Sequence, residues 1–130
     1  MAKWTGGLLL CVLLSAFAGC DGNSLAPFQP EVNNATDSFQ LQATDVQNVG
    51  VILTYAWRNT GSTANVNHAT TTTRGSARLT VLAADGSQVY DRPLEPSRNE
   101  PTSTGPSGEW TVRLTLSDYS GTLNFRLQKP

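Results

Sequence analysis

The amino-acid sequence predicts an all-β fold, a small antiparallel β-sandwich or jelly roll of about seven strands. Three observations predict it. From residue 38 onward, apolar and polar residues alternate with a period of two, as they do in strands with one buried face. Residues that favour turns separate the alternating runs. No segment in this part of the chain has apolar residues at helical spacing.

The first alternating runs are residues 39–43 and 49–57. The second run also carries Ile52 and Ala56 on its other face, which indicates a central strand covered on both sides. A weaker segment surrounds residues 64–66.

The next run, residues 77–83, leads into Asp85-Gly86, a strong hairpin signal, and then into 88–90. Two clear runs follow, 110–116 and 123–127, with a turn expected at 118–121. The alternation predicts a core that contains Trp57, Leu79, Val81, Trp110, Val112, Leu114, Phe125 and Leu127.

The first nineteen residues have the three parts of a secretory signal peptide. Lys3 is the positive charge, residues 8–17 are apolar, and the small residues Ala18 and Gly19 precede Cys20. The apolar run is shorter than the roughly twenty residues that a membrane-spanning helix needs. A core helix is the alternative, but the run is apolar on every face.

Phe17-Ala18-Gly19-Cys20 resembles the lipobox of bacterial lipoproteins, with Phe17 where leucine is commonest. The resemblance implies cleavage between Gly19 and Cys20 and attachment of diacylglycerol to the Cys20 sulfur. It also implies a lipid anchor in a bacterial membrane, with the protein facing the periplasm or the exterior of the cell envelope. Cleavage nearby by an ordinary signal peptidase is the alternative. Asp21 resembles an inner-membrane retention signal of enteric lipoproteins, and the choice of membrane stays open.

The sequence therefore divides into a signal peptide at 1–19, a lipidated cysteine with a flexible tether at 20–36, and a β-sandwich domain at 37–130. The tether is rich in Gly, Pro, Asn and Ser. Alternatively, Phe28 and Val32 pack on the domain as a first edge strand. Cys11 leaves with the signal peptide, so the mature domain has no disulfide.

A second resemblance covers about half of the chain. Residues 77–86, 108–114 and 121–127 resemble the bacterial pre-peptidase C-terminal domain, whose pattern is an Asp-Gly hairpin followed by two Gly-initiated alternating strands. The resemblance implies a non-catalytic β-sandwich of the kind appended to exported enzymes. The first half of the chain, with its 49–57 strand, does not match clearly.

Residues with catalytic or metal-binding chemistry are few. His68 is the only histidine, no Gly-x-Ser-x-Gly motif is present, and we expect His68 to be exposed in a loop or edge strand. One histidine and no mature thiol exclude an ordinary zinc site, and no cofactor is expected. The candidate calcium ligands are Asp85, Asp91 and Asp118, which lie in or beside predicted turns. A hydrolase could use a carboxylate pair from a set of four acids, Glu95, Glu100, Glu109 and Asp118.

The net charge is −1 and the arginines are scattered, which disfavours a nucleic-acid partner. Residues 92–108 form a long Pro-, Ser- and Gly-rich segment, either a mobile loop or, together with 59–73, a binding region. We expect a non-catalytic, lipid-anchored accessory or binding module with an envelope protein or a glycan as partner. The alternatives are a small envelope hydrolase and a self-assembling structural subunit.

Overall fold

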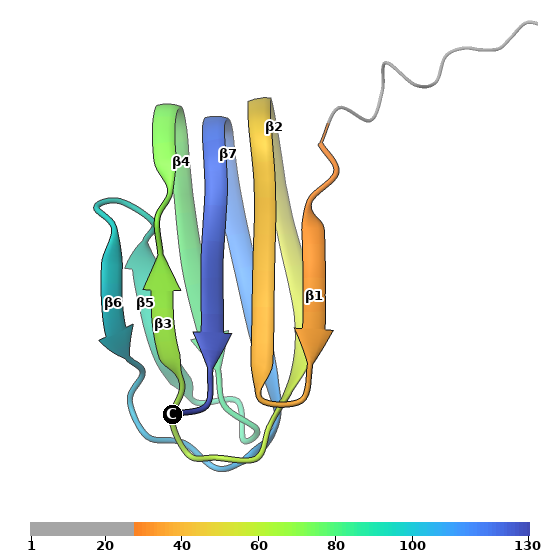
Figure 1. Ribbon diagram of the computed structural model, residues 1–130, viewed down its shortest axis with the longest axis vertical. Helices are drawn as coiled ribbons and strands as arrows, with labels where there is room; N and C mark the ends of the chain where they lie inside the picture. The colour runs from red at the N-terminus through yellow and green to blue at the C-terminus, as the bar shows by residue number, and fades with distance from the viewer. Residues whose placement is uncertain (1–27) are drawn as a thin grey trace, which may run out of the picture.

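The computed structural model describes residues 28–130, so the predicted signal peptide and Cys20 lie outside the described residues. The described part is all-β, and its strands pair antiparallel, which confirms the predicted fold class (Figure 1). No described segment forms a helix that could cross a membrane. Seven strands follow in chain order: β1 (Glu31–Ala35), β2 (Ser38–Asn59), β3 (Asn65–His68), β4 (Thr71–Leu82), β5 (Gln88–Pro93), β6 (Arg98–Pro101) and β7 (Gly108–Gln128).

Strands β2 and β7 form the central pair of the fold. They pair antiparallel over almost their whole lengths, from Ser38 opposite Gln128 to Asn59 opposite Gly108. Along its other edge, β7 pairs with β3 over one part of its length and with β4 over another. The architecture is therefore a long three-stranded ribbon, extended at its edges by β1, β5 and β6.

The ribbon folds over on itself at one level, which we call the fold line. The register shifts between Ala43 and Val51 in β2 and between Thr72 and Ser76 in β4, where β-bulges bend the strands. Residues with positive φ lie at this level on all three strands: Asp45, Asn48, Gly75, Asp118 and Gly121.

The bend creates two packed layers (Figure 1). The front layer contains β1, the first half of β2, the second half of β7, β3 and β6. The back layer contains the second half of β2, the first half of β7, β4 and β5. Because β2 and β7 each run through both layers, the two layers are covalently continuous.

The core lies between the layers, and all eight predicted core residues are buried there. The indoles of Trp57 and Trp110 meet edge to face with centroids 6.0 Å apart. Phe39 stacks on Phe125 across the β2–β7 pair. Aromatic contacts of this kind add about 0.5–1.5 kcal/mol to the stabilisation from burial alone.

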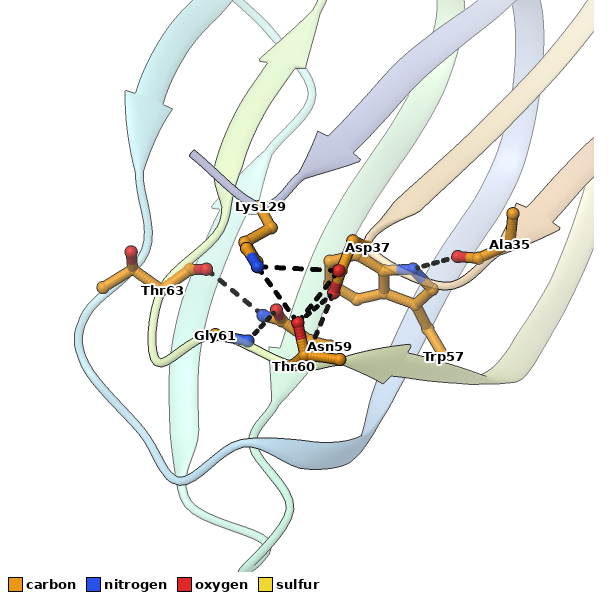
Figure 2. Close-up of polar contacts among 8 residues, drawn as sticks. All are labelled: Ala35, Asp37, Trp57, Asn59, Thr60, Gly61, Thr63 and Lys129. Atoms are coloured by element: carbon orange, nitrogen blue, oxygen red, sulfur yellow. Dashed lines mark hydrogen bonds and ion pairs between the residues drawn. The ribbon is translucent and has the colours of Figure 1, made fainter.

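A polar cluster holds the C-terminal end of the chain against the β1–β2 turn (Figure 2). The Asp37 carboxylate accepts hydrogen bonds from the Thr60 amide and hydroxyl and pairs with the Lys129 ammonium at 3.7 Å. The Trp57 indole nitrogen donates to the Ala35 carbonyl at 2.9 Å, which ties β1 to the back layer. The bond from the Thr60 amide and the nearby Lys129 charge lower the pKa of Asp37.

Several predicted strand boundaries are wrong for one physical reason. The runs 39–43 and 49–57 belong to one strand, β2, and the runs 110–116 and 123–127 belong to β7. Residues 118–121 bend β7 at the fold line instead of ending it. Bulges with positive φ interrupt the alternation of side chains without ending the pairing, so a bend resembles a turn in the sequence.

The second half of β2 is not the two-sided central strand that was predicted. In the back layer it pairs only with β7, and its outward-facing Ile52 is 63% exposed. The apolar residues of its second face lie at the surface.

Two connections predicted from composition contain strands. Residues 31–35, assigned to the tether, form β1 and pair with the start of β2, which matches the alternative in which Val32 packs on the domain. Residues 92–108, considered as a mobile loop, include the end of β5 and β6. Asn- and Pro-rich composition hides both strands because edge strands need little apolar alternation.

Candidate functional site

The two segments predicted to bind a partner, 59–73 and 92–108, lie side by side. They contain β3 and β6, which pair antiparallel with Asn65 opposite Pro101 and His68 opposite Arg98. After β6, the Ser103 amide donates to the Val89 carbonyl of β5 at 2.9 Å. One edge of the sandwich therefore collects residues from β3, β5 and β6.

His68 is buried, contrary to the expectation of an exposed residue. Strand β3 lies between β6 and β7, and its alternation turns Val66 and His68 inward, where His68 is 1% exposed. Its neighbours Asn65 and Asn67 made the segment resemble a loop in the sequence.

The buried His68 and the half-buried Arg98 have buried side-chain nitrogens without a partner among the described residues. Neither ring nitrogen of His68 has a hydrogen-bond partner among the described residues, and the same holds for Nε of Arg98. Burial, reinforced by the Arg98 charge, lowers the pKa of His68, while the Glu100 charge opposes the shift. His68 is therefore neutral near pH 7, with one nitrogen able to donate and one able to accept.

Tyr90, Arg92 and Glu100 form the polar wall beside these two residues. The Tyr90 hydroxyl donates to Oε2 of Glu100 at 2.8 Å, and Nε of Arg92 lies 3.5 Å from the same oxygen. Burial, and then the bond to Glu100, strongly raise the pKa of Tyr90, so the hydroxyl stays protonated. The carboxylate of Glu100 is thus held in place by a hydroxyl and a guanidinium.

A cavity of about 300 Å³ opens at this wall, and we call it the β5–β6 cleft. Its size is at the lower end of the range for small-ligand sites. It offers carboxylate, guanidinium and hydroxyl groups, and its lining among the described residues does not include His68 or Arg98. Its lining includes Gln88, Tyr90, Arg92, Glu100, Pro101 and Ser103.

A larger groove of about 540 Å³ lies at the fold line. Its polar groups bond to one another: the Asn48 amide donates to the Ser120 hydroxyl, and the Thr73 hydroxyl donates to the Ser120 carbonyl. Asp45 and Arg74, which also line it, are exposed. The β5–β6 cleft is the stronger candidate because a hydroxyl and a guanidinium hold a carboxylate at its wall.

The three candidate calcium ligands do not come together. Asp85 lies in the β4–β5 turn and accepts from the Ser87 amide and hydroxyl. Asp91 lies on β5 and forms a 2.7 Å ion pair with Arg78, whose hydrogen bond lowers the pKa of the carboxyl. Asp118 lies at the fold line in β7. Within residues 28–130, no three acidic, histidine or cysteine side chains gather to hold a metal.

The acids considered for hydrolysis lie in different parts of the fold. Glu95 is in the β5–β6 connection, Glu109 is near the start of β7, and Asp118 is at the fold line. Glu100 is the member of this set that lines the cleft. Gly19 and Cys20, the predicted cleavage and lipidation residues, lie outside the described residues.

Sequence reasoning missed Tyr90, Arg92 and Arg98. The sequence does indicate that Arg98 and Glu100 share one face of a strand, because they alternate with Asn99 and Pro101. Charged faces normally lie outside, so the pattern alone would place this face toward solvent. Its inward orientation could not be predicted from the sequence.

The fold and the cleft define a small β-sandwich protein with a polar site at one edge. No protein-family model and no curated protein matches the sequence. Among solved structures, procruciferin, an 11S globulin from Brassica napus, is 21% identical with a TM-score of 0.34 and matches 71% of this chain and 21% of its own. The structure of infectious bursal disease virus Gt strain is 14% identical with a TM-score of 0.33 and matches 93% of this chain and 34% of its own. The chain spans about a fifth and a third of these two proteins, and neither similarity bears on function.

The burial of His68 predicts a pH-dependent stability. Its pKa is lowered on folding, so the unfolded chain binds the proton first. Stability is then fully present above about pH 6.5 and falls as pH decreases, with a slope of at most about 1.4 kcal/mol per pH unit for one proton. Urea unfolding between pH 5 and 8 measures the change.

The matched variant is His68→Leu, which removes the only histidine. Its stability should be flat over the same interval, because the carboxyls with lowered pKa, Asp37, Asp85 and Asp91, lose their contribution only below about pH 4. An equal slope in the wild type and the variant would show that His68 is not the group responsible.

Proposed function

We propose that this protein is an exported lipoprotein, anchored through Cys20 to a bacterial membrane, whose β-sandwich binds an envelope glycan without catalysis. The observation that carries the binding role is the β5–β6 cleft, where the Tyr90 hydroxyl and the Arg92 guanidinium meet the Glu100 carboxylate at its wall.

The chemistry of the cleft favours hydroxyl-bearing ligands. A sugar hydroxyl both donates and accepts, so it can accept from Arg92 and donate to Glu100 in the lining of the cleft. The small volume suits one or two sugar units more than the side chains of a folded protein partner. An envelope protein remains the alternative partner.

A non-catalytic role is supported by the surroundings of His68. A catalytic histidine needs a nucleophile and an orienting acid within hydrogen-bond reach. In the described part of the chain neither His68 nitrogen is hydrogen-bonded, and the acids Glu95 and Glu109 lie on elements other than Glu100. A hydrolase is the alternative, and Glu100 would be its candidate acid.

The spacing between Cys20 and the domain limits how far an anchored domain would lie from the membrane. The described residues begin at Phe28, which packs against the core. Eight residues reach at most about 29 Å when fully extended, so a lipid on Cys20 would keep the domain close to the membrane surface.

The anchor is tested by replacing each cysteine in turn. Cys20→Ser should abolish labelling with a radioactive fatty acid and release the protein into the soluble fraction. Cys11→Ser, the matched control within the signal segment, should keep both properties. Labelling and membrane retention that persist in Cys20→Ser would refute the lipoprotein assignment.

The cleft is tested by co-sedimentation of the full-length protein with purified peptidoglycan. Glu100→Gln removes the charge that organises the cleft and should weaken binding about tenfold or more, as expected for a charged hydrogen bond. Glu109→Gln makes the same change at an exposed position and should bind like the wild type. Equal binding by all three proteins, or no binding by the wild type, would refute this site and ligand class.

A further inference from the structure

The second half of β2 leaves one of its edges open. Residues 51–59 pair with β7 in unbroken register, from Val51 opposite Leu116 to Asn59 opposite Gly108. Strand β1 pairs only with residues 38–42, in the other layer. On the side away from β7, this part of β2 is therefore the rim of the back layer (Figure 1).

Two hydrogen bonds show which residues direct their backbone toward that rim. The Ala56 carbonyl accepts from the Asn34 side chain at 2.8 Å, and the Arg58 carbonyl accepts from the Asp37 amide at 2.9 Å. Neither donor belongs to β7. In an antiparallel strand the N–H and C=O of one residue point to the same side, and the side alternates along the chain. Thr54 and Ile52 therefore also present their backbone groups to the open edge.

Beyond Ala56 and Arg58, which are covered by Asn34 and Asp37, the edge carries none of the features that usually protect one. Natural edge strands are blunted by charged residues, proline or a covering segment. The segment 46–57 contains no charged residue and no proline. Ile52 is the one large apolar side chain that is strongly exposed among residues 28–130.

The inward side of the same edge is incompletely covered. Val51, Leu53 and Tyr55 pack against the core but are only partly buried, unlike Trp57 at the lower end of the strand. Val32 of β1 and Phe28 are also partly buried and pack against the same core. A strand added at the open edge of β2 would cover these side chains as well as the backbone groups.

We propose that the occupant of this edge is a second copy of the chain, paired antiparallel through its own residues 51–57. A two-fold axis at Thr54 places Ile52 of each copy opposite Ala56 of the other on the outer face. On the inner face it places Leu53 opposite Tyr55. Every pair within this register is uncharged, and the two back layers join into one continuous sheet. The Asn34 side chain, which bonds the Ala56 carbonyl in the single chain, must turn away so that this carbonyl can accept from Ile52 of the second copy.

Self-pairing is favoured over a foreign strand because the segment is complementary to itself under this symmetry. The same patch serves both copies, as in an isologous interface. The larger Ile52 meets the small Ala56, and the aromatic Tyr55 meets the aliphatic Leu53, a favourable type of cross-strand pair. This inference does not depend on the anchor or on the β5–β6 cleft.

The two-fold centre gives a direct test by cysteine cross-linking. Thr54→Cys in the full-length protein, purified in detergent, places two thiols opposite each other in the dimer. Facing residues of hydrogen-bonded antiparallel strands have Cα atoms about 5.5 Å apart, within the range that a disulfide spans. Mild oxidation should convert most of the variant into a covalent dimer.

Two controls are compared with Thr54→Cys for the extent of cross-linking. Thr104→Cys places the same change at an exposed residue outside the strands, and the wild type reports any contribution from Cys11 and Cys20. Both should cross-link far less than Thr54→Cys. Equal cross-linking in Thr54→Cys and Thr104→Cys would overturn the proposal.

A second variant separates edge pairing from random collision. Ile52→Lys, added to Thr54→Cys, places a charge on the outer face of the edge, where the side chain points to solvent and folding should be unaffected. The covalent dimer should then be lost while urea unfolding stays unchanged. Undiminished cross-linking would contradict edge pairing, as would a wild-type protein whose sedimentation is strictly that of a monomer at high concentration.

Discussion

The structure depends on the close approach of β2, β4 and β7 where all three bend at the fold line. Gly75 has φ +71°, and a Cβ atom there would collide with the carbonyl oxygens of Ser117 and Asp118. A Cβ at Gly121, with φ +148°, would collide with the Thr71 carbonyl. Asp118 itself adopts a left-handed conformation. The ribbon can therefore fold over because glycine occupies the positions where its backbones come closest.

The other features of the molecule follow from that bend. Folding one ribbon makes two layers that share β2 and β7, so a core containing Trp57, Trp110 and Phe125 forms without a disulfide in the described domain. It also leaves two open sides. On one side, β5 and β6 flank the cleft above the buried His68. On the other side, β1 covers only the lower part of the β2 edge, through Asn34 and Ala35, and leaves Ile52 exposed.

Period-two alternation was sufficient to predict the fold class, the Asp85-Gly86 hairpin and the eight core residues. It could not show that β2 and β7 continue through the bend, because the residues of a bulge with positive φ, such as the one at Asp118, resemble those of a turn in the sequence. It also misjudged His68, since the polar residues beside it lie on the outer face of an interior strand. The Tyr90–Glu100 contact depends on the meeting of β5 and β6 across the sandwich edge, which no local pattern encodes.

The central claim is that the fold line sets the stability of the whole sandwich, and alanine substitution at two glycines of this region tests it. Gly75→Ala should lower the free energy of unfolding in urea by about 2 kcal/mol or more, because left-handed strain adds to the collision. Gly50→Ala is the control, since its nearest neighbouring atom, the Leu116 carbonyl oxygen, is 3.9 Å from the new Cβ. It should leave stability unchanged within about 0.5 kcal/mol. Gly75→Ala with wild-type stability, or an equal loss in both variants, would contradict the account.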